Sequence, residues 1–128
     1  MPEPPTTPTD EIIVTVPLRT QFAATLRLIA ASLGADAGFS IDEIDDIRLA
    51  LNEVFVLLAE QHPSSRGRAT FLFDAGQLTV TMRTEPDVHP VELDELAKNI
   101  LGSVVDEFTA GAHGITLTKR AMESLEGG

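Results

Sequence analysis

Residues that could carry out chemistry are few in this 128-residue chain, and one glutamate stands apart from the rest. The segment from Leu49 to Ala59 is apolar except for Asn52 and Glu53, so a helix formed here would be removed from water on most of its surface. A single carboxylate in such a helix indicates a pocket residue or a contact with a partner. Glu53 also lies at heptad spacing from Asp46 and Glu60, so a solvated stripe of carboxylates remains an equally open interpretation.

Cysteine and histidine, the other residue types common in catalytic and metal sites, do not indicate such a site in this chain. The chain has no cysteine, which excludes a disulfide framework and a thiolate metal site. His62, His89 and His113 are far apart, and none has the spacing of metal ligands. We therefore expect no metal site and interpret all three histidines as surface or turn residues.

Composition narrows the class of function. Nine Lys and Arg residues stand against twenty Asp and Glu residues, which gives a net charge of −11. Such a chain lacks the cations for a phosphate-binding face, so we expect no nucleic-acid partner, whereas an acidic surface suits a basic protein partner. It contains no run of eighteen apolar residues and no signal-peptide pattern, so we expect no membrane partner and a cytoplasmic location.

The helix that carries Glu53 is predicted over Ser40–Gln61. Ser40 is a suitable N-cap, and Glu43 follows it at the spacing of a capping box. Apolar residues recur at steps of three and four along the segment, which predicts one continuous buried stripe. The stripe consists of Ile44, Ile47, Leu51, Val54 and Leu58.

The remaining pattern predicts an α+β fold. Residues 1–10 contain four prolines and nothing to bury, so we expect a disordered tail followed by a single domain over residues 11–128. Strands and helices segregate along the chain, which favours a two-layer sandwich with a mixed, mostly antiparallel sheet and helices on one face. The predicted strands are 11–16, 68–74, 77–83, 107–109 and 115–119, and the other helices are 20–33 and 91–105.

Three segments, in the right order, resemble the serine kinases that act as anti-sigma factors, members of the GHKL ATPase superfamily with the Bergerat fold. The central helix is similar to the N-box helix of that family, the strand ending in TVTMRTEPDVHP to the strand before its G1 box, and the C-terminal region to its closing segment. The resemblance covers nearly all of residues 11–120. The matching residues are Asp46-Ile47-Arg48-Leu49-Ala50, Glu53, Val105-Asp106-Glu107-Phe108 and Leu117-Thr118-Lys119-Arg120.

The resemblance also implies that most nucleotide-binding residues are replaced. The asparagine that binds magnesium in the family falls at Leu57, which offers no oxygen to a hard cation. The aspartate that reads adenine falls at Thr84, and the two glycines of its box fall at Pro86 and Val88. Glu53 alone survives, at the position of the general base. We therefore expect no cofactor and assign no catalytic residue.

Two further features have more than one interpretation. A shift of the alignment by a few residues would put Asp87 in place of the adenine-reading aspartate, although no glycine pair accompanies it. Gly111 and Gly114 resemble a phosphate loop, but a β-turn is favoured because a strand follows them. Lys119 and Arg120 end that strand and are interpreted as surface charges.

The function that the resemblance implies is that of a regulator without kinase activity. It would bind and sequester an alternative sigma factor and be controlled by an anti-anti-sigma partner. One alternative is an active ATP-dependent protein-serine kinase, which would need Mg-ATP, and another is a pseudo-ATPase adaptor in a signalling complex. Nucleotide binding separates the kinase from the other two, and capture of a sigma factor separates the regulator from the adaptor.

The first helix is the predicted partner surface. The family contacts its sigma factor near there, through an arginine that aligns with Ala24. We take Phe22, Leu26, Arg27 and Ile29 as the partner-binding candidates of this chain. The apolar stripes of the first and central helices exceed what one small sheet can bury, so we also expect a two-fold homodimer through the sheet side or the first helix.

Overall fold

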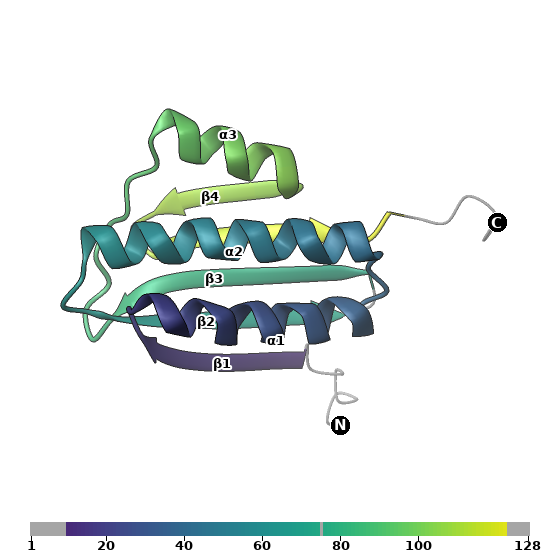
Figure 1. Ribbon diagram of the computed structural model, residues 1–128, viewed down its shortest axis with the longest axis horizontal. Helices are drawn as coiled ribbons and strands as arrows, with labels where there is room; N and C mark the ends of the chain where they lie inside the picture. The colour runs from purple at the N-terminus through teal and green to yellow at the C-terminus, as the bar shows by residue number, and fades with distance from the viewer. Residues whose placement is uncertain (1–9, 75, 123–128) are drawn as a thin grey trace, which may run out of the picture.

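A five-stranded sheet with helices packed on one face makes up the fold (Figure 1). The computed structural model describes residues 10–74 and 76–122, so the predicted disordered tail lies outside the described residues except for Asp10. In chain order the elements are β1 (Asp10–Pro17), a 3-10 turn η1 (Thr20–Phe22), α1 (Ala23–Asp36), α2 (Ile41–Gln61), β2 (Arg66–Asp74), β3 (Gln77–Glu85), α3 (Glu95–Val104), β4 (Glu107–Gly111) and β5 (Gly114–Arg120).

The sheet has the strand order β1-β2-β3-β5-β4, which leaves β1 and β4 at its two edges. Every pair of neighbouring strands in this order is antiparallel. The predicted α+β two-layer sandwich is therefore confirmed, and the sheet is antiparallel in all its described pairs rather than mixed. No helix in the described part of the chain is long and apolar enough to cross a membrane.

α2 is the central element, as the sequence predicts. Ser40 caps it, because its hydroxyl accepts a hydrogen bond from Glu43 N at 3.1 Å while the Glu43 carboxylate accepts one from Ser40 N at 2.8 Å. The helix packs on α1 and α3 as well as on β3 and β5, so its apolar residues are buried on more than one side. These residues are Ile47, Ala50, Leu51, Val54, Phe55, Leu57 and Leu58.

The inner face of the sheet supplies the other half of the core. Along β3 every second residue is buried, which places Leu78, Val80, Met82 and Thr84 beneath the helices. The residues between them are half-buried and face away from the helices. The sheet therefore has one face covered by helices and one that no described helix covers.

The element boundaries differ from the predicted ones for local reasons. α1 continues through Gly34, where a break is predicted, because the glycine permits close packing: a Cβ there would lie 3.1 Å from the Phe39 ring and 3.2 Å from Ile44. α3 begins at Glu95 rather than near Val91, since the Asp94 carboxylate accepts a hydrogen bond from Ala97 N at 2.7 Å and caps the helix.

Candidate functional site

The positions that match the nucleotide site of the family lie on the C-terminal half of α2 and on the segment after β3. Glu53 is half-buried, and Leu57, one turn later on the same helix, is buried. Val54 and Leu58 belong to the core, as we predict. Leu57 itself lines a cavity of about 770 Å³, so apolar side chains of α2 close this region only in part.

The cavity lies between the end of α2 and residues 90–94. Three carboxylates line it, and none of the described residues around it is Lys or Arg. Carboxylates repel the phosphates of a nucleotide, so the charge of this cavity opposes triphosphate binding. Besides Leu57, its lining consists of Glu60, Gln61, His62, Pro90, Glu92, Leu93 and Asp94.

Thr84, at the position of the adenine-reading aspartate, is fully buried at the end of β3. Its hydroxyl donates a hydrogen bond to Asp87 O at 2.6 Å and accepts one from His89 N at 2.7 Å. Both bonds fasten the turn that follows the strand. Pro86 is exposed and Val88 half-buried in that turn. The hydroxyl thus has its donor and an acceptor site already occupied by the backbone of the protein.

The segment after this turn is fastened to the end of α2. The side-chain amide of Gln61 donates to Glu92 O at 2.8 Å and accepts from Glu92 N at 2.9 Å. His62 Nε2 bonds Pro90 O at 2.7 Å, and because a carbonyl only accepts, this nitrogen carries the proton. His62 also stacks on His89, with ring centroids 4.9 Å apart. Both imidazoles are half-buried, so these two histidines hold the segment rather than being simple surface residues.

Replacing Leu57 with asparagine tests whether burial of its side chain stabilises the fold. Leu57→Asn should lower the free energy of unfolding by about 1–3 kcal/mol, because it replaces a buried leucine with an amide that lacks partners. Leu49→Asn, the same change at an exposed position of the same helix, is the matched control and should cost less. Urea unfolding measures both. Equal stabilities for the two variants, or a gain of Mg-ATP affinity by Leu57→Asn, would contradict this account.

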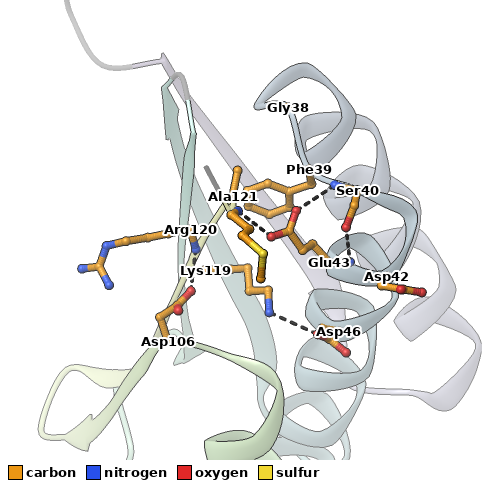
Figure 2. Close-up of a pocket in the computed structure, with 11 residues that line it drawn as sticks. Gly38, Phe39, Ser40, Asp42, Glu43, Asp46, Asp106, Lys119, Arg120 and Ala121 are labelled. Carbon is orange, nitrogen blue, oxygen red and sulfur yellow. Dashed lines mark hydrogen bonds and ion pairs between the residues drawn. The ribbon is translucent and has the colours of Figure 1, made fainter. Parts of the chain in front are cut away.

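A second cavity, of about 700 Å³, lies at the other end of α2 (Figure 2). Lys119, interpreted from the sequence as a surface charge, points inward there, and its side chain is only 12% exposed. Its ammonium group pairs with Asp46 at 3.2 Å and donates to Val104 O at 2.9 Å. The surface interpretation of Lys119 is therefore wrong, since the end of β5 packs against α2, whereas Arg120 is exposed as expected.

Glu43 connects α2 to the end of the described chain at this cavity. Its second carboxylate oxygen accepts a hydrogen bond from Met122 N at 2.6 Å. Burial raises the pKa of Glu43, but the hydrogen bonds from the backbone N–H groups of Ser40 and Met122, the side chain of Ser40 and the charge of Lys119 together outweigh it, so the pKa lies below its ordinary value of 4.5.

Because its pKa is lowered in the folded state, the Glu43 carboxylate makes a contribution to stability that depends on pH. It is present above the ordinary glutamate range and is lost as the pH falls through the lower value of the folded state. Glu43→Gln should therefore be less stable than the parent at pH 7 and should lose less stability between pH 6 and pH 3. Asp42→Asn, on the same exposed turn, is the control. A parallel pH profile for parent and Glu43→Gln in urea unfolding would refute this role.

Most of the predicted partner-binding residues at α1 pack against the core instead of facing a partner. Leu26 is 2% exposed and packs in the core, while Phe22 and Ile29 are half-buried against it. Leu26 and Ile29 lie on the inner side of α1, and Phe22 precedes the helix in η1, because the apolar stripe in the sequence is the stripe that the fold buries. Of the four candidates, Arg27 extends to the outer side, where it donates to the Asn52 side chain of α2 at 2.7 Å.

Besides Arg27, the outer side of α1 and α2 carries residues that the sequence pattern does not indicate as partner contacts. Arg27 and Arg48 line two adjoining hollows of about 440 and 220 Å³. Leu28 on α1 is 73% exposed, and Leu49 on α2 is also exposed. We call this surface, formed by Arg27, Leu28, Arg48, Leu49 and Asn52, the outer groove. In the sequence, Leu28 and Leu49 lie off the apolar stripes. A leucine outside such a stripe is expected to face outward, and this is the signal that could have identified both residues.

Comparison with known proteins gives a likeness of fold. No protein-family model matches the chain, and no curated protein does. Thirteen chains of solved structures match. Among them is the crystal structure of the RsbU and RsbW domains of Rv1364c from Mycobacterium tuberculosis, with a TM-score of 0.59, 17% identity and coverage of 91% of this chain. The match spans 35% of that chain. This likeness shows a shared fold.

The shared fold agrees with the α+β two-layer sandwich that the sequence predicts. The positions that match the nucleotide site of the family lie on the C-terminal half of α2 and at and after the end of β3, whereas the outer groove lies at the junction of α1 and α2. The described residues contain no group of three or more His, Cys, Asp or Glu side chains that could hold a metal ion. The outer groove brings exposed arginine and leucine side chains together on one surface.

Proposed function

We propose that this protein is an anti-sigma-factor-like regulator that acts by binding. It holds an alternative sigma factor in the cytoplasm, is released by an anti-anti-sigma protein, and neither binds ATP nor transfers phosphate. The resemblance of the central helix and of the closing segment to anti-sigma-factor serine kinases supports this class of function. The fold shared with a chain that contains an RsbW domain supports it at the level of architecture.

The observation that carries the proposal is the outer groove. In a chain with a net charge of −11, two arginines and two leucines face outward together at the junction of α1 and α2. Arg27 is held by a neutral amide, and Arg48 is 3.5 Å from Asp45 in an exposed pair, so both guanidinium groups can meet a carboxylate of a partner. Arginine beside exposed leucine is typical of interface anchors.

Charge reversal at the groove tests the proposal. The sigma factors encoded in the same genome would be purified and their affinities measured one by one by titration calorimetry. Arg48→Glu should weaken the binding of the recognised sigma factor by about tenfold or more. Lys98→Glu on α3 is a matched control, because Lys98 is similarly exposed and also forms an i,i+3 ion pair.

The apolar part of the groove has its own control. Leu28→Asp should weaken binding by a similar factor, whereas Leu96→Asp, at a residue of α3 that is 66% exposed, should leave it unchanged. Capture of no sigma factor by the parent protein would overturn the proposed function. Capture that both groove variants leave intact would overturn only the placement of the binding surface.

A further inference from the structure

One face of the sheet is covered by no described helix, and we call it the uncovered face. Residues alternate along a strand, so Arg83, which lies between the buried Met82 and Thr84, points to this face. Four of the nine Lys and Arg residues of the chain lie on the uncovered face, and they are Arg66, Arg68, Arg83 and Arg120. All but Arg120 lie together where β1 and β3 end and β2 begins (Figure 1).

We call Arg66, Arg68, Arg83 and Glu85 the arginine corner. Arg68 of β2 is directly opposite Arg83 of β3, and Arg66 is directly opposite Glu85. Residues opposite each other in antiparallel strands have Cβ atoms about 4.5–5.5 Å apart, and like charges in such a pair are destabilising. The side chains of Arg68 and Arg83 are also partly withdrawn from water, since they are only 31% and 34% exposed. The fold therefore holds two cations where they repel each other.

Glu85 compensates this charge only in part. Its Oε1 atom lies 3.2 Å from Arg68 Nη1 and 3.9 Å from Arg83 Nη2, so one oxygen serves both arginines. Its Oε2 atom accepts a hydrogen bond from the Thr15 hydroxyl at 3.3 Å. Within residues 10–74 and 76–122, Arg66 forms no ion pair. Three guanidinium groups therefore share one carboxylate, which leaves an excess of two positive charges.

We propose that the arginine corner binds a phosphoryl dianion, the group that inorganic phosphate and phosphorylated side chains have in common. A phosphoryl group carries a charge of about −1.5 to −2 near pH 7, which matches the excess at the corner. Guanidinium groups bind phosphoryl oxygens through paired N–H donors in a fixed geometry. The 3.9 Å from Arg83 to Glu85 is longer than a hydrogen bond, so this guanidinium keeps donors for a further acceptor.

The charge of the whole chain favours a compact anion over an extended one. A net charge of −11 repels a polyanion such as nucleic acid along its length. At 0.15 M ionic strength charges separated by more than about 8 Å are largely screened, so a small dianion in contact with the arginines interacts mainly with the corner. Arg66 is exposed, which leaves room for the remainder of a phosphate ester. The corner lies on the uncovered face and the outer groove on the helices, so the test below is independent of the proposed function.

Nuclear magnetic resonance of the isotope-labelled full chain, titrated with inorganic phosphate at pH 8, tests the site directly. Sodium chloride keeps the ionic strength constant, so that general screening cannot cause the response. The backbone amide signals of residues 66–68 and 83–85 should shift and saturate at millimolar phosphate, whereas that of Arg120 should not move.

A second titration identifies the source of the phosphoryl group. Phosphothreonine with acetyl and methylamide caps represents a phosphorylated side chain, and threonine with the same caps is its control. If the capped phosphothreonine binds at least as tightly as inorganic phosphate, the corner accepts a phosphorylated side chain of a partner protein. If inorganic phosphate alone binds, the ligand is the free anion.

Neutral substitutions at the corner separate binding from a structural role. Arg83→Gln should weaken phosphate binding about tenfold, the effect of losing one charge-assisted hydrogen bond. Arg120→Gln is the matched control, because Arg120 is an arginine of the same face that is paired with Glu107 at 3.1 Å. Glu85→Gln should tighten binding several-fold, since it removes the carboxylate that competes with the ligand, whereas Glu107→Gln should leave it unchanged.

Arg66→Gln provides a variant whose folding is not at risk, because Arg66 is exposed and forms no ion pair within the described part of the chain. It should also weaken binding, and circular dichroism would confirm that each variant is folded. A parent that shows no saturable shift with either anion would overturn the proposal. So would binding that Arg83→Gln and Arg66→Gln leave intact, or a Glu85→Gln protein that binds phosphate no more tightly than the parent, which is the result expected if the corner only fastens the end of the sheet.

Discussion

Titration calorimetry with Mg-ATP is expected to detect no binding at millimolar nucleotide. The position that binds magnesium in the resembled family is Leu57, which is buried and has no oxygen. The position that reads adenine is Thr84, whose hydroxyl is engaged by Asp87 O and His89 N. Each lost polar contact or metal bridge costs on the order of 1–3 kcal/mol, so the loss of several takes a micromolar site beyond millimolar.

The charge of the nearby cavity acts in the same direction. Glu60, Glu92 and Asp94 line it, so nucleotide phosphates would meet carboxylates where a nucleotide site needs donors. A serine kinase of the resembled family that binds ATP, titrated under the same conditions, serves as the positive control. A dissociation constant below about a millimolar, or transfer of phosphate to a serine of a partner, would favour the kinase alternative, with Glu53 as the base to be tested next.

Local signals in the sequence predict the helical layer well. The capping box of Ser40 and Glu43 forms as expected, because both halves of it lie within one turn of the chain. The apolar stripe of α2 predicts its burial, and alternation along β3 predicts which of its residues face the core. These features depend on periodicity, which a single sequence contains.

Contacts between distant segments were not predictable in the same way. His62 and His89 stack only because the turn after β3 returns to the end of α2, and no spacing in the sequence encodes that approach. Leu26 illustrates a second limit. An apolar stripe indicates that a helix face leaves water, but it does not say whether the fold or a partner covers it, and here the fold covers it. The outward leucines, Leu28 and Leu49, lie off the apolar stripes, so the stripes alone do not indicate them.

The most severe effect on stability among the polar residues of the candidate site is expected for Thr84→Val. Valine fills the volume of threonine but makes neither hydrogen bond, so Asp87 O and His89 N lose the partner that the buried Thr84 side chain provides. The free energy of unfolding should fall by about 1–3 kcal/mol, the cost of leaving a partly buried backbone group without its partner. Urea unfolding measures the change.

A threonine-to-valine change on the other face of β3 serves as the control. It makes the same replacement at a position where less is buried, so it shows how much of the loss is due to the hydrogen bonds of Thr84. Thr81→Val lies on β3 three residues earlier, where the hydroxyl is half-buried and shares a hydrogen bond of 3.1 Å with Thr116, so it should cost less than Thr84→Val. Hydrogen exchange provides a second readout, because His89 N–H should exchange faster in Thr84→Val alone. If both variants lose equal stability and His89 remains protected, the turn after β3 is held by Gln61 and His62 rather than by Thr84. The threonine would then be available to a ligand, and the argument against nucleotide binding would depend on Leu57 and the carboxylates.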